Sequence, residues 1–152
     1  MPALRVIGSA TSSVHDGAGS FPISNLLDKN LSTFFATGEG DHSWVSVKVR
    51  DEAVISFVAV YNRPGKTWQQ RQLGSFEVWR GSDFGDAGQF TRKSARACGE
   101  GHLFGGTREA GEAPFVFWCG FEAYANFITV RQSGEHRSLA LAELMIFGAN
   151  PD

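Results

Sequence analysis

Apolar and polar residues alternate in two short stretches of the chain. The clearer stretch is 45–49, Val-Ser-Val-Lys-Val, which follows Trp44. Side chains of a strand point alternately to its two faces, so this pattern predicts a strand with one buried face. Residues 75–80, Ser-Phe-Glu-Val-Trp-Arg, alternate in the same way and end at Gly81, which predicts a second strand of this kind.

Other stretches are apolar without alternation. Residues 54–61 are rich in β-branched side chains, and a turn sequence, Asn62-Arg63-Pro64-Gly65, follows them. Such a run predicts a central strand rather than a helix. Further strands are predicted at 4–7, 114–119, 126–131 and 139–147, and a helical turn is predicted within 23–31.

The number and length of these elements indicate the fold class. Short strands joined by turn residues are typical of β-sandwiches, and 18 glycines with 13 phenylalanines favour strands and tight turns over helices. We therefore predict an all-β fold, a jelly-roll sandwich of about eight antiparallel strands. A chain of 152 residues suits one domain, here residues 1–152.

Charge and hydropathy exclude several kinds of partner. The 14 basic and 16 acidic residues give a net charge of −2, and because they are spread along the chain we expect no surface for nucleic acid. No apolar run approaches the roughly 20 residues of a membrane span, so we expect no membrane insertion. The first residues do not resemble a secretory signal. We therefore expect a cytoplasmic or assembly-associated protein, unless the chain is a mature form.

Glu143 lies in the last predicted strand. Because side chains alternate along a strand, Glu143 shares its face with four large apolar residues. These are Leu139, Leu141, Met145 and Phe147. A carboxylate on an inward face is costly unless it is paired or bound to a metal ion. The sequence therefore predicts a partner for Glu143.

A loop near the start of the chain is rich in oxygen-bearing side chains. These belong to Asn25, Asp28, Asn30, Ser32 and Thr33. Ca²⁺ takes six to eight oxygens from carboxylates, amides, hydroxyls and backbone carbonyls. Taken alone, the loop is better explained as a polar cap on a helical turn. Together with Glu143 it favours a Ca²⁺ site, since the loop needs charge and the carboxylate needs a cation.

Five short motifs occur in one order along the chain. They are Asn25-x-x-Asp28-x-Asn30, a strand that starts at Trp44, the pair Asn62-Arg63, residues 74–78 (Gly-Ser-Phe-Glu-Val) and residues 139–144 (Leu-Ala-Leu-Ala-Glu-Leu). Over about residues 4–148 this order resembles the F-type lectins, or fucolectins, within the discoidin or coagulation factor 5/8 type C class. The resemblance implies a galactose-binding-like sandwich. It also implies a structural Ca²⁺ held by Asn25, Asp28, Asn30, Thr33 and Glu143.

The resemblance further implies a sugar site in the loop 62–71. Members of the family bind fucose with a histidine, an Arg-x-Asp pair and a second basic residue. Here Arg63 stands at the arginine position, and Gly65 takes the place of the aspartate. The second basic residue is Lys66 or Arg71.

Two more side chains complete the expected site. The family's histidine position falls near Ala36 or Thr37, so this ligand is missing unless His42 turns in to replace it. Trp68 offers an aromatic face to sugar C–H groups. The implied ligand is fucose or a related sugar on a glycan or glycoprotein, and because shallow sugar sites bind weakly, an oligomer is expected.

Cys98 and Cys119 are the two cysteines of the chain. They either close one loop in an oxidising compartment or remain thiols in a reducing one. The resemblance implies a disulfide in this region.

Catalysis is not expected. No pair of carboxylates converges in an obvious way, and the four histidines lack the spacing of zinc ligands. The leading hypothesis is a non-catalytic lectin-like module. The alternative is a protein–protein interaction module that forms a structural part of a larger assembly, such as a ciliary complex or a virion, because the sugar motif is incomplete and no export signal is visible.

Overall fold

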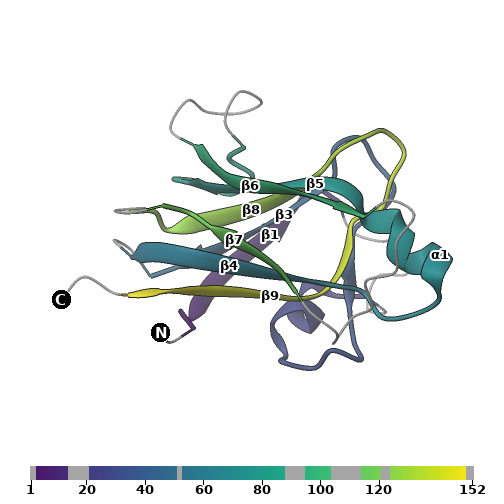
Figure 1. Ribbon diagram of the computed structural model, residues 1–152, viewed down its shortest axis with the longest axis horizontal. Helices are drawn as coiled ribbons and strands as arrows, with labels where there is room; N and C mark the ends of the chain where they lie inside the picture. Colours follow the sequence, from purple (N-terminus) through teal and green to yellow (C-terminus); the bar gives the residue numbers. More distant parts are fainter. Residues whose placement is uncertain are drawn as a thin grey trace.

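Two antiparallel sheets stack face to face in the computed structural model (Figure 1). The structure describes residues 3–13, 21–50, 53–87, 95–103, 114–120 and 124–149. In the order in which they pair, the strands of the five-stranded sheet are β1 (Val6–Thr11), β3 (Trp44–Val49), β8 (Phe127–Gln132), β5 (Gly74–Gly81) and β6 (Arg96–Leu103). Those of the four-stranded sheet are β2 (Phe35–Ala36), β9 (Ala140–Ala149), β4 (Val54–Asn62) and β7 (Phe115–Trp118).

Helical structure among these residues is confined to three short segments. They are η1 (Ile23–Leu27), α1 (Thr67–Gln70) and η2 (Arg71–Leu73). Within the part of the chain that is described, no helix has the length and hydropathy needed to cross a membrane. The predicted all-β sandwich is therefore confirmed, and the helical turn expected within 23–31 corresponds to η1.

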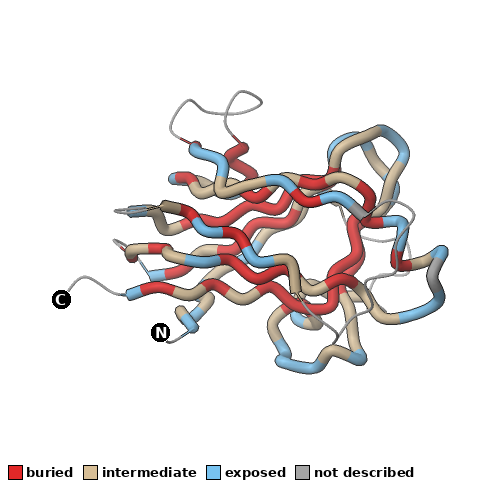
Figure 2. Tube along the Cα trace, in the orientation of Figure 1, coloured by how far each residue is buried: buried red, intermediate tan, exposed pale blue. Residues whose placement is uncertain are grey.

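The core lies between the two sheets and follows the predicted alternation. Figure 2 shows the buried segments concentrated along the facing strands. Val45 and Val47 of β3 and Val78 of β5 have no exposed surface. Phe76 of β5 meets Phe117 of β7 edge to face, with ring centroids 5.8 Å apart. Period-two sequence patterns therefore identified the inward faces of these strands.

β6 was not predicted, because its sequence neither alternates nor favours strands. Its residues Gly99 and Gly101 lie opposite large core rings. A Cβ atom on Gly101 would lie 2.3 Å from Cζ of Phe76, and one on Gly99 would lie 2.6 Å from Cδ1 of Phe117. The glycines make room for aromatic side chains of neighbouring strands, a requirement that only the assembled sheets impose.

The Cys98–Cys119 disulfide joins β6 to the end of β7. These strands lie at one edge of the five-stranded and the four-stranded sheet respectively. The sequence left open whether the two cysteines are bonded, and the structure pairs them across the two sheets.

β9 contains an irregularity that changes the expected position of Glu143. Tyr61 pairs with Glu143, but the next residue of β4, Asn62, pairs with Leu141, so one residue of β9 is extra at this point. A bulge of this kind reverses the alternation beyond it. Leu141 belongs to the core before the bulge, and Leu144 and Ile146 belong to it afterwards.

The prediction that Glu143 shares the core face with Leu139 and Leu141 is therefore wrong. Glu143 lies with Met145 and Phe147 on the outer face of the sheet. It is nevertheless buried, with 3% of its surface exposed, because other segments cover that face.

Candidate functional site

The first candidate site surrounds Glu143 on the outer face of β9. A cavity of about 360 Å³ opens there, and Leu4, Leu27 and Lys29 line it together with Glu143. The Leu4 N–H donates to the carbonyl of Ile146 at 2.7 Å. The segment before β1 and the η1 region thus cover the carboxylate.

Glu143 receives its hydrogen bonds from the loop after η1. The backbone N–H of Lys29 donates to Oε1 at 3.0 Å and to Oε2 at 3.3 Å. Lys29 has a positive φ of 58°, an uncommon conformation for a non-glycine residue. Burial raises the pKa of Glu143 to about 7, the Lys29 N–H opposes this increase, and the negative charge of Asp28 adds to it.

Asp28, Asn30 and Thr33 lie in the same loop, and Asn25 lies in η1. Asp28 accepts hydrogen bonds from the Thr33 hydroxyl and from the backbone N–H of Asn30, and the Thr33 bond is the main reason why the pKa of Asp28 is lowered. The backbone carbonyl of Asn30 accepts from the Thr33 hydroxyl at 3.1 Å. Asn25 donates through its amide nitrogen to the carbonyl of Phe34 at 3.0 Å.

These contacts bring Asp28, Asn30 and Thr33 together and tie their loop to Glu143, whereas the contact of Asn25 is to Phe34. Asp28 and Glu143 are close enough for their charges to interact, and a buried carboxylate beside a second carboxylate is unfavourable without a cation. Carboxylate, amide and hydroxyl oxygens are also the donors that Ca²⁺ prefers. The residues present therefore fit a hard divalent cation.

The second candidate site lies at the end of the sandwich that carries α1 (Figure 1). A cavity of about 580 Å³ opens there. Its polar lining residues are Ser13, Glu39, Arg63, Gln72 and Ser138, and its other lining residues are Phe21, Phe34, Ala36, Gly38 and Ala140. They come from at least five separate segments of the chain, so only the folded protein brings them together.

Arg63 is positioned by the end of β4. The buried Asn62 accepts from the Arg63 backbone N–H at 2.9 Å and donates through its own amide nitrogen to the carbonyl of Gln70 at 2.9 Å. Arg63 Nε donates to the carbonyl of Pro64 at 3.1 Å. The guanidinium lies over the ring of Phe34, 4.0 Å from its centroid.

The guanidinium of Arg63 is partly buried, and the ring beneath it stacks on a second ring. Burial lowers the pKa of Arg63, but an arginine remains protonated near neutral pH. Phe34 stacks on Phe21 with centroids 4.6 Å apart and ring planes 19° from parallel. Among the described residues, no hydrogen bond involves the terminal guanidinium nitrogens of Arg63. The described residues therefore leave these nitrogens available to a ligand in the cavity.

The other residues predicted for the sugar site do not line this cavity. Lys66, Trp68 and Arg71 are exposed around α1 and η2, and Trp68 is 61% exposed. His42 is exposed in the turn before β3. Their roles in sugar binding stay predictions. The other residues that line this cavity lie outside the motif around Arg63, so the sequence pattern did not indicate them.

A smaller cavity of about 240 Å³ adjoins the second site. Glu39, Gln72 and Ser138 line both cavities, and His136 and Arg137 line only the smaller one. Arg137 is held by two backbone carbonyls and donates to that of Gln72 at 2.7 Å. The two cavities therefore form neighbouring parts of one concave region.

Comparison with known proteins gives a fold but no sequence family. No family model matches the chain, and no curated protein matches it. A fucolectin from the serum of Morone saxatilis (striped bass) superposes with a TM-score of 0.74 and 18% identity, over 95% of this chain and 46% of that one. The lectin domain of lectinolysin, complexed with Lewis B antigen, superposes with a TM-score of 0.68 and 18% identity, over 93% of this chain and 92% of that one.

A third solved structure has a similar fold. The module CpGH89CBM32-5 from Clostridium perfringens, in complex with GalNAc-β-1,3-galactose, gives a TM-score of 0.71 and 15% identity, over 97% of this chain and 100% of that one. All three structures are less than 25% identical to this chain in sequence, so the similarity establishes the fold only. The galactose-binding-like, discoidin-type sandwich implied by the sequence motifs is thereby confirmed.

Proposed function

We propose that this protein is a non-catalytic, lectin-like module that binds a glycan or glycoprotein in the Arg63 cavity. One observation carries the proposal. The guanidinium of Arg63 is fixed over Phe34 at the edge of a 580 Å³ cavity, with its terminal nitrogens unused by the described residues.

The polar side chains of the cavity suit sugar hydroxyls. A guanidinium donates two parallel hydrogen bonds, which adjacent hydroxyl oxygens can accept. Glu39 supplies an acceptor for hydroxyl protons, and the amide of Gln72 both donates and accepts. Because one cation and one anion line the same cavity, we favour a neutral sugar over an acidic one.

The apolar part of the lining supports fucose or a related sugar with a methyl or C–H face. Phe21, Ala36 and Ala140 provide apolar surface in the same cavity. Contacts of sugar C–H groups with aromatic faces add to hydroxyl recognition. The similar folds of the lectinolysin domain with Lewis B antigen and the Clostridium module with GalNAc-β-1,3-galactose support a glycan as the ligand class.

A structural Ca²⁺ belongs to this proposal. Asp28, Asn30, Thr33 and Glu143 would hold the ion, with Asn25 contributing its amide oxygen. The ion would neutralise the two carboxylates and fasten the loop after η1 to β9. This role is scaffold stabilisation, since the Ca²⁺ site and the Arg63 cavity share no lining residue.

Calorimetric titration with L-fucose and galactose, followed by a glycan array, tests the sugar proposal. We expect weak, saturable binding that Arg63→Ala abolishes and Arg63→Lys weakens, because lysine keeps the charge but loses the planar fork. Arg96→Ala, at an exposed arginine of β6, is the matched control. Absence of binding at millimolar sugar, or equal binding by Arg63→Ala, would refute the proposal.

A protein-binding role is the second candidate, and a different surface favours it. Phe57 of β4 pairs with Trp118 of β7, and both are exposed on the outer face of the four-stranded sheet together with Val116. Contiguous exposed apolar residues often mark protein interfaces. A stoichiometric protein partner recovered from the native source without glycan dependence, and lost in Trp118→Ser, would favour this role in a larger assembly.

A further inference from the structure

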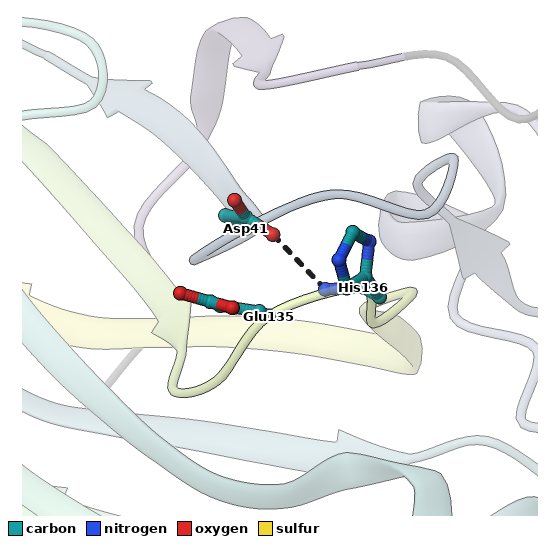
Figure 3. Close-up of side chains that lie close together, drawn as sticks. All are labelled: Asp41, Glu135 and His136. Carbon is teal, nitrogen blue, oxygen red and sulfur yellow. Dashed lines mark hydrogen bonds between the residues drawn. The ribbon is translucent and has the colours of Figure 1, made fainter.

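Three side chains of the types that bind metal ions meet beside the concave region, and none of them lines the Arg63 cavity or the Glu143 cavity. Asp41 lies in the connection between β2 and β3, and Glu135 and His136 lie in the connection between β8 and β9 (Figure 3). One ligand atom of each residue lies within 4.8 Å of the other two. All three side chains are exposed, so they can adjust at little cost.

The backbone holds these two connections together. The His136 N–H donates to Oδ1 of Asp41 at 3.0 Å, which is the dashed line in Figure 3. Gly40 and Arg137 exchange two backbone hydrogen bonds, of 3.1 and 2.9 Å. The backbone positions of the three residues are thus set before any ion binds.

The two carboxylates of the cluster have no cationic partner in the part of the chain that the structure describes. No ion pair involves Asp41 or Glu135 there. The nearby Arg137 directs its guanidinium to the carbonyls of Gln72 and Ser133 instead. A cation at the cluster would therefore relieve repulsion between two like charges without displacing an existing ion pair.

We propose that Asp41, Glu135 and His136 bind a divalent transition-metal ion of the Zn²⁺ type. An imidazole nitrogen with carboxylate oxygens suits Zn²⁺ and its neighbours, whereas Ca²⁺ prefers oxygen ligands alone. Zn²⁺ bonds of about 2.0–2.2 Å place tetrahedral ligand atoms about 3.3–3.6 Å apart, which is compatible with ligand atoms that all lie within 4.8 Å of one another.

Three protein ligands leave one coordination position open. His136 also lines the smaller cavity beside the Arg63 site, so a small ligand or water at that position would lie near the rim of the concave region. The metal site itself does not depend on glycan binding. It is also distinct in ligand chemistry from the oxygen-only site of Asp28 and Glu143.

Isothermal titration of chelator-treated protein with ZnCl₂, in millimolar Ca²⁺ to saturate the oxygen site, tests the proposal. We expect one saturable equivalent of Zn²⁺ and at least about tenfold weaker binding by His136→Ala. Glu135→Gln should also weaken binding while preserving the size of the exposed side chain. His102→Ala is the matched control, because His102 is another exposed histidine beside a glutamate.

The visible absorption of bound Co²⁺ provides a second measurement. It would not change in His136→Ala if His136 had only a structural role. A site of one nitrogen and oxygen ligands should give visible absorption bands on Co²⁺ addition, and His136→Ala should remove them while His102→Ala keeps them. The proposal fails if the intact protein shows no saturable Zn²⁺ binding. It fails equally if His136→Ala and Glu135→Gln bind Zn²⁺ as the intact protein does.

Discussion

At the residue scale, Glu143 combines burial with an ionisable group. It is a buried carboxylate on the outer face of a sheet, and the Lys29 N–H bonds both of its oxygens. Burial raises its pKa from 4.5 to about 7. The ionised form is thus unfavourable in the metal-free protein, and a bound cation would reverse that preference.

The raised pKa predicts how stability depends on pH. Between pH 4.5 and about 7 the folded protein keeps a proton on Glu143 that the unfolded chain has lost, so the free energy of unfolding should decrease as the pH rises. The total decrease is about 3 kcal/mol at most, since each tenfold change in proton affinity corresponds to about 1.4 kcal/mol. Urea unfolding of chelator-treated protein from pH 4 to 8 measures it.

Calcium should act on the same residue. Ca²⁺ bound to ionised Glu143 should raise the melting temperature by several degrees at pH 8, and Glu143→Gln should lose both this response and the decrease with pH. A melting temperature at pH 8 that is the same with Ca²⁺ and with chelator would contradict the site.

At the element scale, β6 shows how a strand can form without strand-favouring residues. Its pairing with β5 places Gly101 opposite Phe76, and its glycines leave space for rings from other strands. The bulge in β9 acts at the same scale, since one extra residue moves Glu143 from the core face to the outer face. Both features arise from pairing between strands that are distant in sequence.

Gly101→Ala tests the packing of β6. Its new Cβ would lie 2.3 Å from Cζ of Phe76, a side chain with 1% of its surface exposed. Overpacking of this kind costs about 1–3 kcal/mol, measurable by urea unfolding. Gly40→Ala is the control, because its nearest contact would be 3.6 Å from Ser43 Oγ. Equal stabilities for the two variants would argue against the close approach.

At the scale of the whole molecule, one covalent link connects the two sheets at an open edge. Cys98 and Cys119 are 21 residues apart and come from β6 and the end of β7. The core between the sheets also depends on this edge, since Phe117 packs there against Phe76.

Replacing both cysteines by alanine should lower the free energy of unfolding by about 3 kcal/mol, chiefly because the unfolded chain is no longer restricted by a closed loop. Urea unfolding of the intact protein and of Cys98→Ala/Cys119→Ala measures the difference. A reductant should destabilise the intact protein to a similar degree and leave the variant unchanged. If the reductant lowered the free energy of unfolding of both proteins equally, the decrease would not be due to the disulfide.

Features that depend on residues close together in the chain could be predicted from the sequence. Alternation at Val45 and Val47 identified a buried face, because strand geometry has a period of two residues. The loop of Asp28 and Asn30 indicated oxygen donors, and the resemblance to the F-type lectins indicated Arg63. The fold class followed from many such local signals.

Contacts between residues that are distant in sequence depend on the folded structure. Glu143 lies on the outer face because of a register shift between β4 and β9, and Arg63 meets Phe34 because separate loops converge at one end of the sandwich. Asp41 and His136 are far apart in sequence, so no sequence motif could have predicted that they cluster. Local periodicity determines the faces of strands, whereas binding sites depend on the contacts between segments that folding creates.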